Sequence, residues 1–438
     1  VKNNPESGVV ASVASHVYNS IIVDIRDKEY FEKAGYKMKY DATRKTTVDA
    51  WREFRNKCSK RALVIMPVQT GELREFAIKN NLFVLNLNKE LGDAGAGQNI
   101  SLLEEVLAWL EPNAPVYGWE QGVSEDQFVA RVSKSGHPMI PCDWSYNHSL
   151  LSLLYEKGRE QVLPRIFDPR SIDFKKKKNF VSFFLSDGDN IQWMMQDFAS
   201  RYYDVPEAED VKMTFGLPVA TLAMMAPVQF NNLMGLQKQN CSLMEMLGGG
   251  YYYVDTYSQD HNRKTNLRVA AKRLAVSMRQ YQIKLLGIMA MDVKSEAAKE
   301  AYQVYVDAND QLEGIVVLQY SPYAGGEGEV FWVTNKAGYD IPVITVKYSL
   351  WDRIHEREGS PDFIASKLKE EAQEESFSVV CVHAWSRFEG DTYGASAAKR
   401  CAERLDDRFE AINMQELVWR LRMSRRPEQT LDYLNKIY

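Results

Sequence analysis

Apolar runs a few residues long alternate with amphipathic stretches through the C-terminal half of the chain. Eight of these runs are apolar enough to form strands that are buried on both faces of a sheet. They are Phe180–Leu185, Val211–Gly216, Gly250–Val254, Lys284–Met289, Gly314–Leu318, Pro342–Val346, Ser378–Val382 and Phe409–Ile412. Eight strand–helix units predict a (β/α)-barrel, with the TIM barrel as the favoured form. A seven-stranded barrel or an open doubly wound sheet would give a similar pattern.

Helices are expected between most of these strands. In residues 266–281, apolar side chains recur at the three-to-four spacing of a helix that lies on a sheet. Ser360 followed by Pro361 is typical of a helix start, with serine as the N-cap and proline in the first turn.

Short β-rich runs also alternate with helical stretches in the N-terminal part of the chain, which predicts an α/β region with largely parallel strands. These runs are Ile21–Asp24, Ala62–Met66, Leu82–Leu85, Val116–Trp119 and Met139–Cys142. The alternation stops in residues 163–180, which contain two prolines and a lysine run. We therefore expect an N-terminal α/β region, of one or two small subdomains, in residues 1–174 and a barrel-like catalytic domain in residues 175–438.

The composition narrows the classes of function. The 438 residues carry a formal net charge of −5, which provides no basic field for a nucleic acid. No apolar stretch approaches the roughly 20 residues that a membrane-spanning helix needs. The five cysteines form no Cys-x-x-Cys pair, so we expect buried thiols in place of a zinc cluster or a disulfide framework. The chain starts at Val1, and we expect that an upstream segment, such as an export signal, has been removed.

Polar and aromatic residues directly follow several of the predicted barrel strands. They are Ser186, Asp187, Gly188, Asp189 and Asn190 after the first strand, Asp292 after the fourth, Gln319 and Tyr320 after the fifth, and His383 and Trp385 after the seventh. The carboxyl ends of parallel barrel strands open on one face, so these side chains are expected to meet there.

The segment 186–190 is the strongest local signal, because it places two carboxylates and an amide around one glycine. Three interpretations are open. The acids can form an Asx turn that caps the following helix, bind a hard cation, or act as catalytic or sugar-binding groups.

A glycine run leads into alternating tyrosines in residues 248–255. A tyrosine offers an apolar face to a pyranose ring and a hydroxyl to its polar edge, although tyrosines are also common in ordinary strands. Gly248, Gly250, Tyr251 and Tyr253 have the spacing Gly-x-Gly-Tyr-x-Tyr. The chain thereby resembles the bacterial family of putative glycoside hydrolases named for the motif Gly-x-Gly-Tyr-x-Tyr-x-Pro, although Asp255 stands in place of the proline.

The resemblance covers nearly the whole chain. It implies a carbohydrate-active protein that is secreted or held in the cell envelope of a bacterium, in the periplasm or on the outer surface.

Glycoside hydrolysis usually needs two carboxyl groups on opposite sides of the scissile bond. Asp187 is the first candidate, and Asp189 is a second candidate in the same segment. Asp292 is the best-placed partner from another strand end, whereas Asp255 and Glu327 are weaker candidates.

Aromatic and polar residues near the predicted strand ends are expected to bind the sugar. They are Asn190, Tyr251, Tyr253, Asp255, Gln319, Tyr320, His383 and Trp385. In the N-terminal region, Trp119 with Glu120 and Asp143 with Trp144 also place an acid beside an indole after a predicted strand. These four residues are expected to line the same cleft.

Two other classes of function stay open. A metal-dependent hydrolase, such as a sugar deacetylase, would hold a divalent cation with Asp187, Asp189 and His383. A two-carboxylate hydrolase needs no cofactor. A non-catalytic glycan-binding protein would use the same acids and aromatics without cleaving the sugar.

Overall fold

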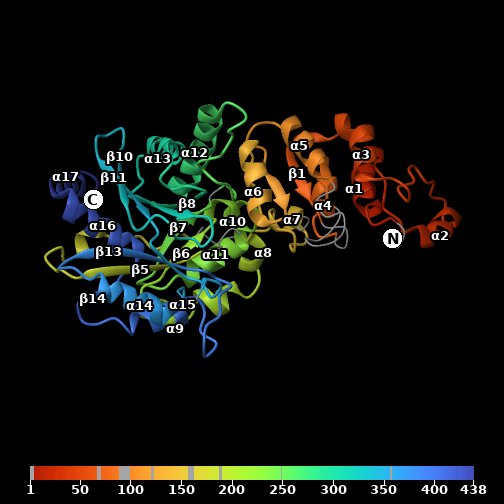
Figure 1. The fold of residues 1–438 in the computed structure, drawn as a ribbon. Coiled ribbons are helices and arrows are strands. Elements are labelled where there is room, and N and C mark those ends of the chain that lie inside the picture. The colour runs from red at the N-terminus through yellow and green to blue at the C-terminus, as the bar shows by residue number, and fades with distance from the viewer. Residues whose placement is uncertain are drawn as a thin grey trace. The chain divides into compact units, whose positions relative to one another are not determined.

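The computed structural model describes residues 4–66, 71–87, 99–119, 123–155, 162–186, 190–247, 249–355 and 358–438. The chain forms two compact units. Unit 1 comprises Val1–Leu154, Gly250–Tyr252 and Tyr257–Asn266, and unit 2 comprises Tyr155–Gly249, Tyr253–Thr256 and Leu267–Tyr438. Figure 1 shows the elements of both units along the chain.

Unit 1 is built on a parallel sheet of four strands in the order β2-β1-β3-β4. The strands are β1 (Ser59–Ile65), β2 (Leu82–Leu85), β3 (Val116–Gly118) and β4 (Met139–Ile140). The helices of this part of the chain are α1 (Ser7–Tyr18), α2 (Lys28–Lys33), α3 (Thr47–Phe54), α4 (Arg74–Lys79), α5 (Ile100–Trp109), α6 (Glu125–Lys134) and α7 (His148–Leu151). β2, β4 and the second half of β1 are buried, as expected for a parallel sheet covered by helices, whereas Lys60 and Arg61 at the start of β1 are exposed.

One predicted strand of unit 1 is wrong. Residues 20–24 have no regular secondary structure, and 58% of the Ile21 side chain is exposed. An apolar run forms a strand only where a neighbouring strand satisfies its backbone groups, and none pairs with this segment among the described residues.

Two later segments of the chain complete unit 1. Tyr251 forms an antiparallel bridge with Met139 of β4, whose N–H donates to the Tyr251 carbonyl oxygen at 3.0 Å. The Tyr257 hydroxyl donates to Asn113 Oδ1 at 2.7 Å. Residues from both sides of the predicted domain boundary therefore belong to the same unit.

Unit 2 contains a curled sheet of mostly parallel strands. They are β5 (Asn179–Leu185), β6 (Thr214–Leu217), β7 (Ser242–Met246), β8 (Leu285–Ala290), β9 (Gly314–Gln319), β10 (Val330–Thr334), β11 (Asp340–Thr345), β12 (Tyr348–Leu350), β13 (Ser376–Val382) and β14 (Phe409–Ala411). Their order is β10-β11-β9-β8-β7-β6-β5-β13-β12, and β14 pairs with β5. Only the edge strand β10 is antiparallel to its neighbour among these pairings.

The sheet curls because one chain segment pairs at both of its ends. β11 pairs with β9, and β12 pairs with β13, although only Val346 and Lys347 separate β11 from β12. The series of parallel pairings therefore begins at β11 and ends at β12, and both strands lie within residues 340–350. The α/β domain predicted from the sequence is therefore present, with a curled, barrel-like sheet. β14, the eighth expected strand, is short and pairs only with the first residues of β5.

One predicted barrel strand lies elsewhere along the chain, and another begins later than predicted. No strand forms at Gly250–Val254, and the corresponding strand of the sheet is β7 at Ser242–Met246. β7 contains Ser242 and the buried Glu245, so its sequence lacks a continuous apolar pattern. β6 begins only at Thr214, because Lys212 has a left-handed backbone with φ of 52° that ends the preceding helix.

Helices surround the sheet of unit 2. They are α8 (Ile191–Met194), the π-helix η4 (Ala199–Tyr203), α9 (Pro206–Asp210), α10 (Val219–Met225), α11 (Pro227–Leu236), α12 (Arg263–Gln280), α13 (Glu296–Ala308), α14 (Pro361–Glu370), α15 (Gly394–Ala402), α16 (Met414–Arg425) and α17 (Pro427–Ile437). The predicted start of α14 is confirmed, since Ser360 Oγ accepts from the Phe363 N–H at 3.3 Å. Within the described residues, no helix is both long and apolar enough to span a bilayer.

Helix α16 packs against the amino ends of the strands. The Met414 N–H donates to Thr214 Oγ1 at the start of β6 at 2.8 Å. A Cβ atom on Gly314, at the start of β9, would lie 2.9 Å from Val418 Cγ2. This tight packing covers the amino ends, whereas the carboxyl ends carry the candidate site.

Candidate active site at the carboxyl ends of the barrel strands

A chain of aromatic rings connects the carboxyl ends of several strands of unit 2. The Tyr253 and Tyr320 ring centroids are 5.4 Å apart, and the Tyr320 and Tyr323 centroids are 6.2 Å apart. Tyr323 in turn contacts Trp351 at 5.1 Å and His383 at 5.6 Å. The Trp351 and His383 rings are stacked, with centroids 4.6 Å apart and an interplanar angle of 14°. The fold thus assembles residues that follow β9, β12 and β13 into one aromatic cluster.

The buried His383 imidazole is linked to an exposed carboxylate through a serine. His383 Nδ1 lies 3.0 Å from Ser386 Oγ, and Ser386 Oγ lies 3.3 Å from Asp352 Oδ1. The Arg387 N–H donates to the other Asp352 oxygen at 2.9 Å. Asp352 is exposed and Ser386 is buried.

The loop between β9 and β10 holds part of the cluster on a strained backbone. Ser321 and Tyr323 have φ values of 36° and 63°, a region that costs residues with a side chain about 1–2 kcal/mol. A Cβ atom on Gly326 would overlap the Thr345 side chain, whose hydroxyl donates to the Gly326 carbonyl at 2.8 Å. The loop is therefore fixed against β11, and such strain is frequent at ligand-binding sites.

Asp255 and Gln319 support the turn that presents Asp292. The two carboxylate oxygens of the buried Asp255 accept from the Met291 and Asp292 N–H groups at 3.0 and 2.9 Å. Gln319 Oε1 accepts from the Val293 N–H at 3.4 Å. Asp292 itself is exposed, and its Oδ1 accepts from the Lys294 N–H at 2.9 Å.

Trp385 offers an exposed indole beside this region. Its side chain is 45% exposed, and its ring centroid lies 4.8 Å from that of Trp193. Trp193 is buried and also contacts Phe198 at 4.7 Å and Tyr202 at 4.8 Å. Trp385 therefore stands on a rigid aromatic base that can support a stacking surface.

The segment 186–190 is only partly described. Asp187 and Asp189 lie outside the described residues. Asn190 precedes α8, and its carbonyl accepts from the Trp193 N–H at 3.2 Å, but its side chain forms no cap hydrogen bond with the helix. Gln192 Nε2 lies 3.5 Å from Asn190 Oδ1.

The tyrosines of the glycine-rich motif belong to different units. Tyr251 is buried in unit 1, where its hydroxyl donates to Glu125 Oε1 at 2.9 Å and its ring stacks on Trp119 with centroids 6.4 Å apart. Tyr253 is buried in unit 2 beside Met289 of β8. Gly248 lies outside the described residues.

The other predicted residues of the N-terminal region also belong to unit 1. Asp143 is buried, whereas Trp144 is 60% exposed. Glu120 lies outside the described residues.

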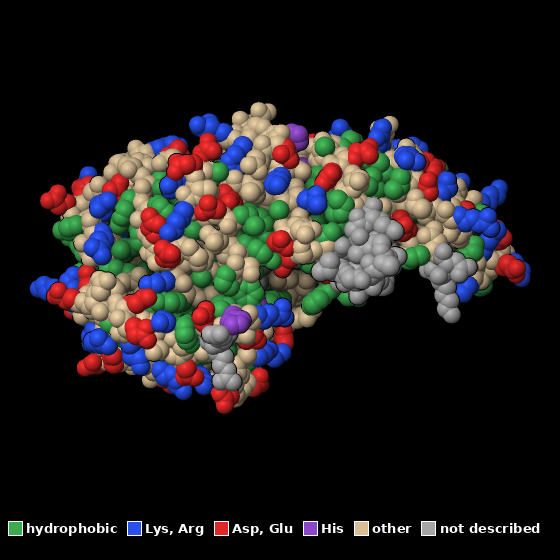
Figure 2. All heavy atoms as spheres, in the orientation of Figure 1, with side chains coloured by type: hydrophobic (Ala, Val, Ile, Leu, Met, Phe, Trp, Pro, Cys, Tyr) green, Lys and Arg blue, Asp and Glu red, His purple; other side chains and the backbone are tan. Residues whose placement is uncertain are grey.

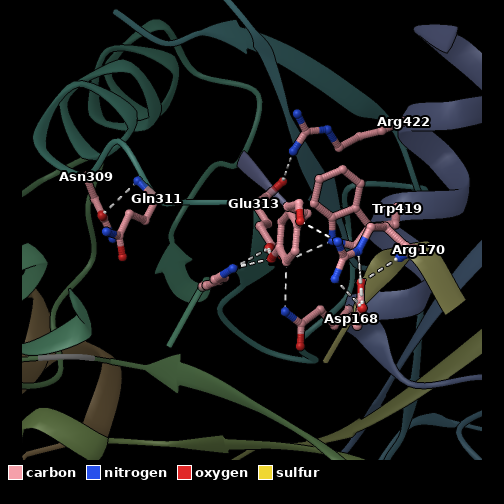
Figure 3. Close-up of polar contacts among 10 residues, drawn as sticks. Asp168, Arg170, Asn309, Gln311, Glu313, Trp419 and Arg422 are labelled. Atoms are coloured by element: carbon pink, nitrogen blue, oxygen red, sulfur yellow. Dashed lines mark hydrogen bonds and ion pairs between the residues drawn. The ribbon is translucent and has the colours of Figure 1, made fainter. Parts of the chain in front are cut away.

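A fully buried carboxylate at the amino end of the sheet has a different environment (Figure 3). Glu313 immediately precedes β9 and accepts from Trp419 Nε1 at 2.9 Å and Gln415 Nε2 at 2.8 Å. It also pairs with Lys284 at 3.3 Å and accepts from the Tyr438 hydroxyl. Several donors thus satisfy this carboxylate, which is typical of a structural role at the amino end of a barrel.

Glu245 on β7 is also fully buried but has fewer partners. Its Oε2 accepts from the Ala220 N–H at 3.0 Å, while Oε1 has no hydrogen-bond partner among the described residues. Burial raises the pKa of this carboxyl to about 8, although the Ala220 and Val219 backbone N–H groups oppose the shift. Glu245 is therefore largely protonated at neutral pH.

Four residues of this site were not predicted from the sequence: Tyr323, Trp351, Asp352 and Ser386. One signal was available for two of them. Val346, Tyr348 and Leu350 alternate with polar residues and extend the predicted strand at Pro342–Val346 up to Trp351 and Asp352.

No group of three or more His, Cys, Asp or Glu side chains that could hold a metal ion occurs among the described residues, which exclude Asp187 and Asp189. On the face shown in Figure 2, basic and acidic side chains are interspersed. All five cysteines are free thiols, and only Cys58 is not fully buried.

Comparison with known proteins assigns the family. The model of the GxGYxYP putative glycoside hydrolase C-terminal domain matches residues 177–422, which is more than half of the chain. The chain belongs to the GxGYxYP family. The model of the GxGYxYP third domain matches residues 60–153 of this GxGYxYP protein, within unit 1. The resemblance inferred from the glycine and tyrosine spacing is thereby confirmed.

A solved structure shares the fold of the GxGYxYP protein. It is described as a putative hydrolase from Bacteroides thetaiotaomicron VPI-5482 and is 18% identical, with a TM-score of 0.79. The match covers 97% of this chain and 78% of that one. No curated protein matches the chain.

Proposed function

We propose that the GxGYxYP protein hydrolyses glycosidic bonds in an oligosaccharide or polysaccharide at the carboxyl ends of the unit 2 strands. The observation that carries this proposal is the aromatic cluster from Tyr253 to His383. Aromatic faces stack on the apolar faces of sugar rings, while tyrosine hydroxyls and the imidazole can bind sugar hydroxyls. The exposed Trp385 adds a further stacking surface.

Two carboxyl groups are needed for the proposed reaction, one to protonate the leaving oxygen and one to act as nucleophile or base. We propose Asp187 as one of them, because it follows Ser186 directly after β5 in the sequence. Asp292 is the proposed partner, because it is exposed and its turn is fixed by Asp255. Asp189 is the alternative acid from the same segment as Asp187.

The proposal is tested by measuring release of reducing ends from a panel of glycans with the full chain and with Asp187→Asn and Asp292→Asn variants. Loss of a catalytic carboxyl is expected to reduce turnover by about 10²–10⁴-fold. An Asp391→Asn variant is the matched control, because Asp391 is exposed on a turn with φ of 54°, which asparagine tolerates.

Three outcomes would contradict the proposal. Full activity in both variants would exclude these acids. Glycan binding by the parent chain and by Asp187→Asn, with turnover by neither, would indicate a binding protein. Activity that is lost on chelation and restored by a divalent cation would indicate a metal-dependent hydrolase or deacetylase.

A further inference from the structure

We infer that the glycan bound by this protein carries an anionic group, a carboxylate or a sulfate, and that Arg387 binds this group beside a sugar ring stacked on Trp385. The inference rests on the proposed function, because it names the class of glycan that the same site accepts. Arg387 is a specificity-determining residue in this arrangement.

A short hairpin after β13 fixes the place of Arg387. Phe388 and Thr392 form an antiparallel bridge, in which the Phe388 N–H donates to the Thr392 carbonyl oxygen at 2.9 Å. The residues that flank a bridged pair also face each other, so Arg387 lies opposite Tyr393. The Arg387 Cζ atom is 3.7 Å from the centroid of the Tyr393 ring. The Arg387 backbone N–H donates to Asp352 Oδ2 at 2.9 Å, which attaches the hairpin to the end of β12.

Tyr202 connects this guanidinium to the exposed indole of Trp385. Arg387 Nη2 donates to the Tyr202 hydroxyl at 3.3 Å. The ring centroid of Tyr202 lies 4.8 Å from that of the buried Trp193, and the Trp385 centroid lies 4.8 Å from the same ring. A cation and an exposed stacking surface therefore share one rigid aromatic support.

The positive charge of Arg387 has no partner of opposite sign. The side chain is exposed, and no carboxylate among the described residues forms an ion pair with its guanidinium. Asp352 contacts only the backbone N–H of this residue. A guanidinium carries five N–H donors, and the Tyr202 hydroxyl takes one of them, so the others can bind an anion.

Arg201 shows the opposite arrangement beside the same tyrosine. Its Cζ atom lies 5.6 Å from the centroid of the Tyr393 ring, and its guanidinium pairs with Asp197 at 2.9 Å. The charge of Arg201 is thus compensated within the protein, whereas that of Arg387 is not. Because the whole chain has a formal net charge of −5, the attraction for an acidic glycan has to come from a local cation of this kind.

A guanidinium beside an indole matches the chemistry of an acidic sugar. The planar guanidinium binds a carboxylate or a sulfate through two parallel hydrogen bonds. The indole stacks on the apolar face of a pyranose ring. A neutral sugar makes only the second contact, so the pair selects sugars that carry an anionic group.

The test measures the binding of acidic glycans and of their neutralised forms to the full chain by isothermal titration calorimetry. The probes are oligosaccharides of polygalacturonate, alginate, hyaluronan and chondroitin sulfate, their carboxyl-reduced or desulfated forms, and neutral glucans, xylans and mannans. We expect an acidic probe to bind, and removal of its anionic group to weaken binding about tenfold or more. Carboxyl reduction and desulfation show which of the two groups is bound. Binding of neutral probes alone, or of no probe, would overturn the inference.

Matched variants assign the effect to Arg387. Arg387→Gln should weaken binding of the acidic probe about tenfold and leave binding of its neutralised form unchanged. Arg387→Lys keeps the charge without the planar fork and should recover part of the loss. Arg201→Gln is the control, because Asp197 already compensates the charge of Arg201. Equal losses in Arg387→Gln and Arg201→Gln would indicate a general charge effect and reject the assignment.

A folding defect would not leave the inference untested. If Arg387→Gln does not fold, Arg387→Lys takes its place and should bind the acidic probe less tightly than the parent chain does. Equal binding by Arg387→Lys and the parent would then count against Arg387.

Turnover separates this inference from the proposed function. Binding of an acidic glycan that depends on Arg387, without release of reducing ends, would leave the assignment of the ligand intact and reject the hydrolase. Hydrolysis of neutral glycans that Arg387→Gln leaves unchanged would support the proposed function and overturn the inference.

Discussion

The two ends of the unit 2 sheet hold their polar side chains in different ways. At the amino end, the Glu313 carboxylate is fully buried and accepts from Trp419, Gln415 and Tyr438 while it pairs with Lys284. At the carboxyl end, His383 is connected through Ser386 to the exposed Asp352. Burial of a carboxylate therefore does not by itself mark a functional site. In this sheet the closed polar network stabilises the fold, and the network that reaches solvent carries the proposed chemistry.

The largest effect is expected when the closed network is broken. Glu313→Ala leaves the Trp419 N–H and the Lys284 ammonium without their acceptor, and breaking a buried ion pair costs about 3–5 kcal/mol. Urea unfolding should show this loss in the free energy of unfolding. Turnover should be unchanged under conditions where the variant is folded.

Two further variants calibrate this result. Glu313→Gln retains the shape and one acceptor, so it should cost less than Glu313→Ala. Glu296→Ala, which breaks an exposed pair with Lys299, should cost less than about 1 kcal/mol. A cost of that small size for Glu313→Ala as well would refute the contrast between the two ends.

A pH-dependent effect is expected at Glu245. Its pKa is raised to about 8 by burial, so the folded chain keeps a proton that the unfolded chain loses above about pH 4.3. The free energy of unfolding should therefore fall as the pH rises between these values, by at most about 1.4 kcal/mol per pH unit from this group.

Glu245→Gln tests this directly, because the amide keeps an acceptor for the Ala220 N–H and does not titrate. Relative to the parent chain, it should become more stable as the pH rises from about 5 to about 8, as measured by urea unfolding. The exposed Glu296→Gln is the control and should follow the parent. A constant difference between Glu245→Gln and the parent across this range would show that Glu245 does not titrate there.

The smallest effect is expected at the carboxyl end itself. Trp385→Ala removes an exposed indole, so glycan affinity or kcat/KM should fall about tenfold, or about 1.4 kcal/mol, with a smaller change in unfolding free energy. Trp385→Phe should recover part of the loss. Tyr30→Ala, which removes an exposed aromatic ring in unit 1, should have no effect on binding. If Trp385→Ala lowered the free energy of unfolding but left glycan binding unchanged, Trp385 would have a structural role, like the residues of the amino-end network.

Most of the parallel architecture could be predicted from the sequence, because strands buried on both faces leave continuous apolar runs such as Phe180–Leu185 and Gly314–Leu318. The exceptions have specific physical causes. β7 contains Glu245, which is buried because a backbone N–H of helix α10 donates to it. This contact leaves no signal in the sequence of β7 itself. At Ile21–Asp24, the apolar pattern was present, but no strand among the described residues pairs with the segment.

The candidate site could be predicted only in part. His383 and Tyr320 were found because they directly follow apolar runs. Ser386 was missed because a buried serine in a turn has no distinctive pattern, and Asp352 was missed because β11 and β12 were not recognised as one interrupted strand. Tyr251 and Tyr253 looked equivalent, but Tyr251 forms a bridge with Met139 in unit 1, whereas Tyr253 forms a bridge with Met289 in unit 2.

The return of residues 250–252 and 257–266 to unit 1 has a consequence for biosynthesis. A ribosome completes Met139 long before Tyr251, so the edge of β4 emerges without the strand neighbour that it has in the finished protein. N-terminal domains that fold early during translation usually fold through contacts among their own residues. Here the first unit cannot be finished until much of the second has been translated, so a fragment cut after Leu154 is expected to be less stable and more prone to aggregate than the same residues in the intact chain.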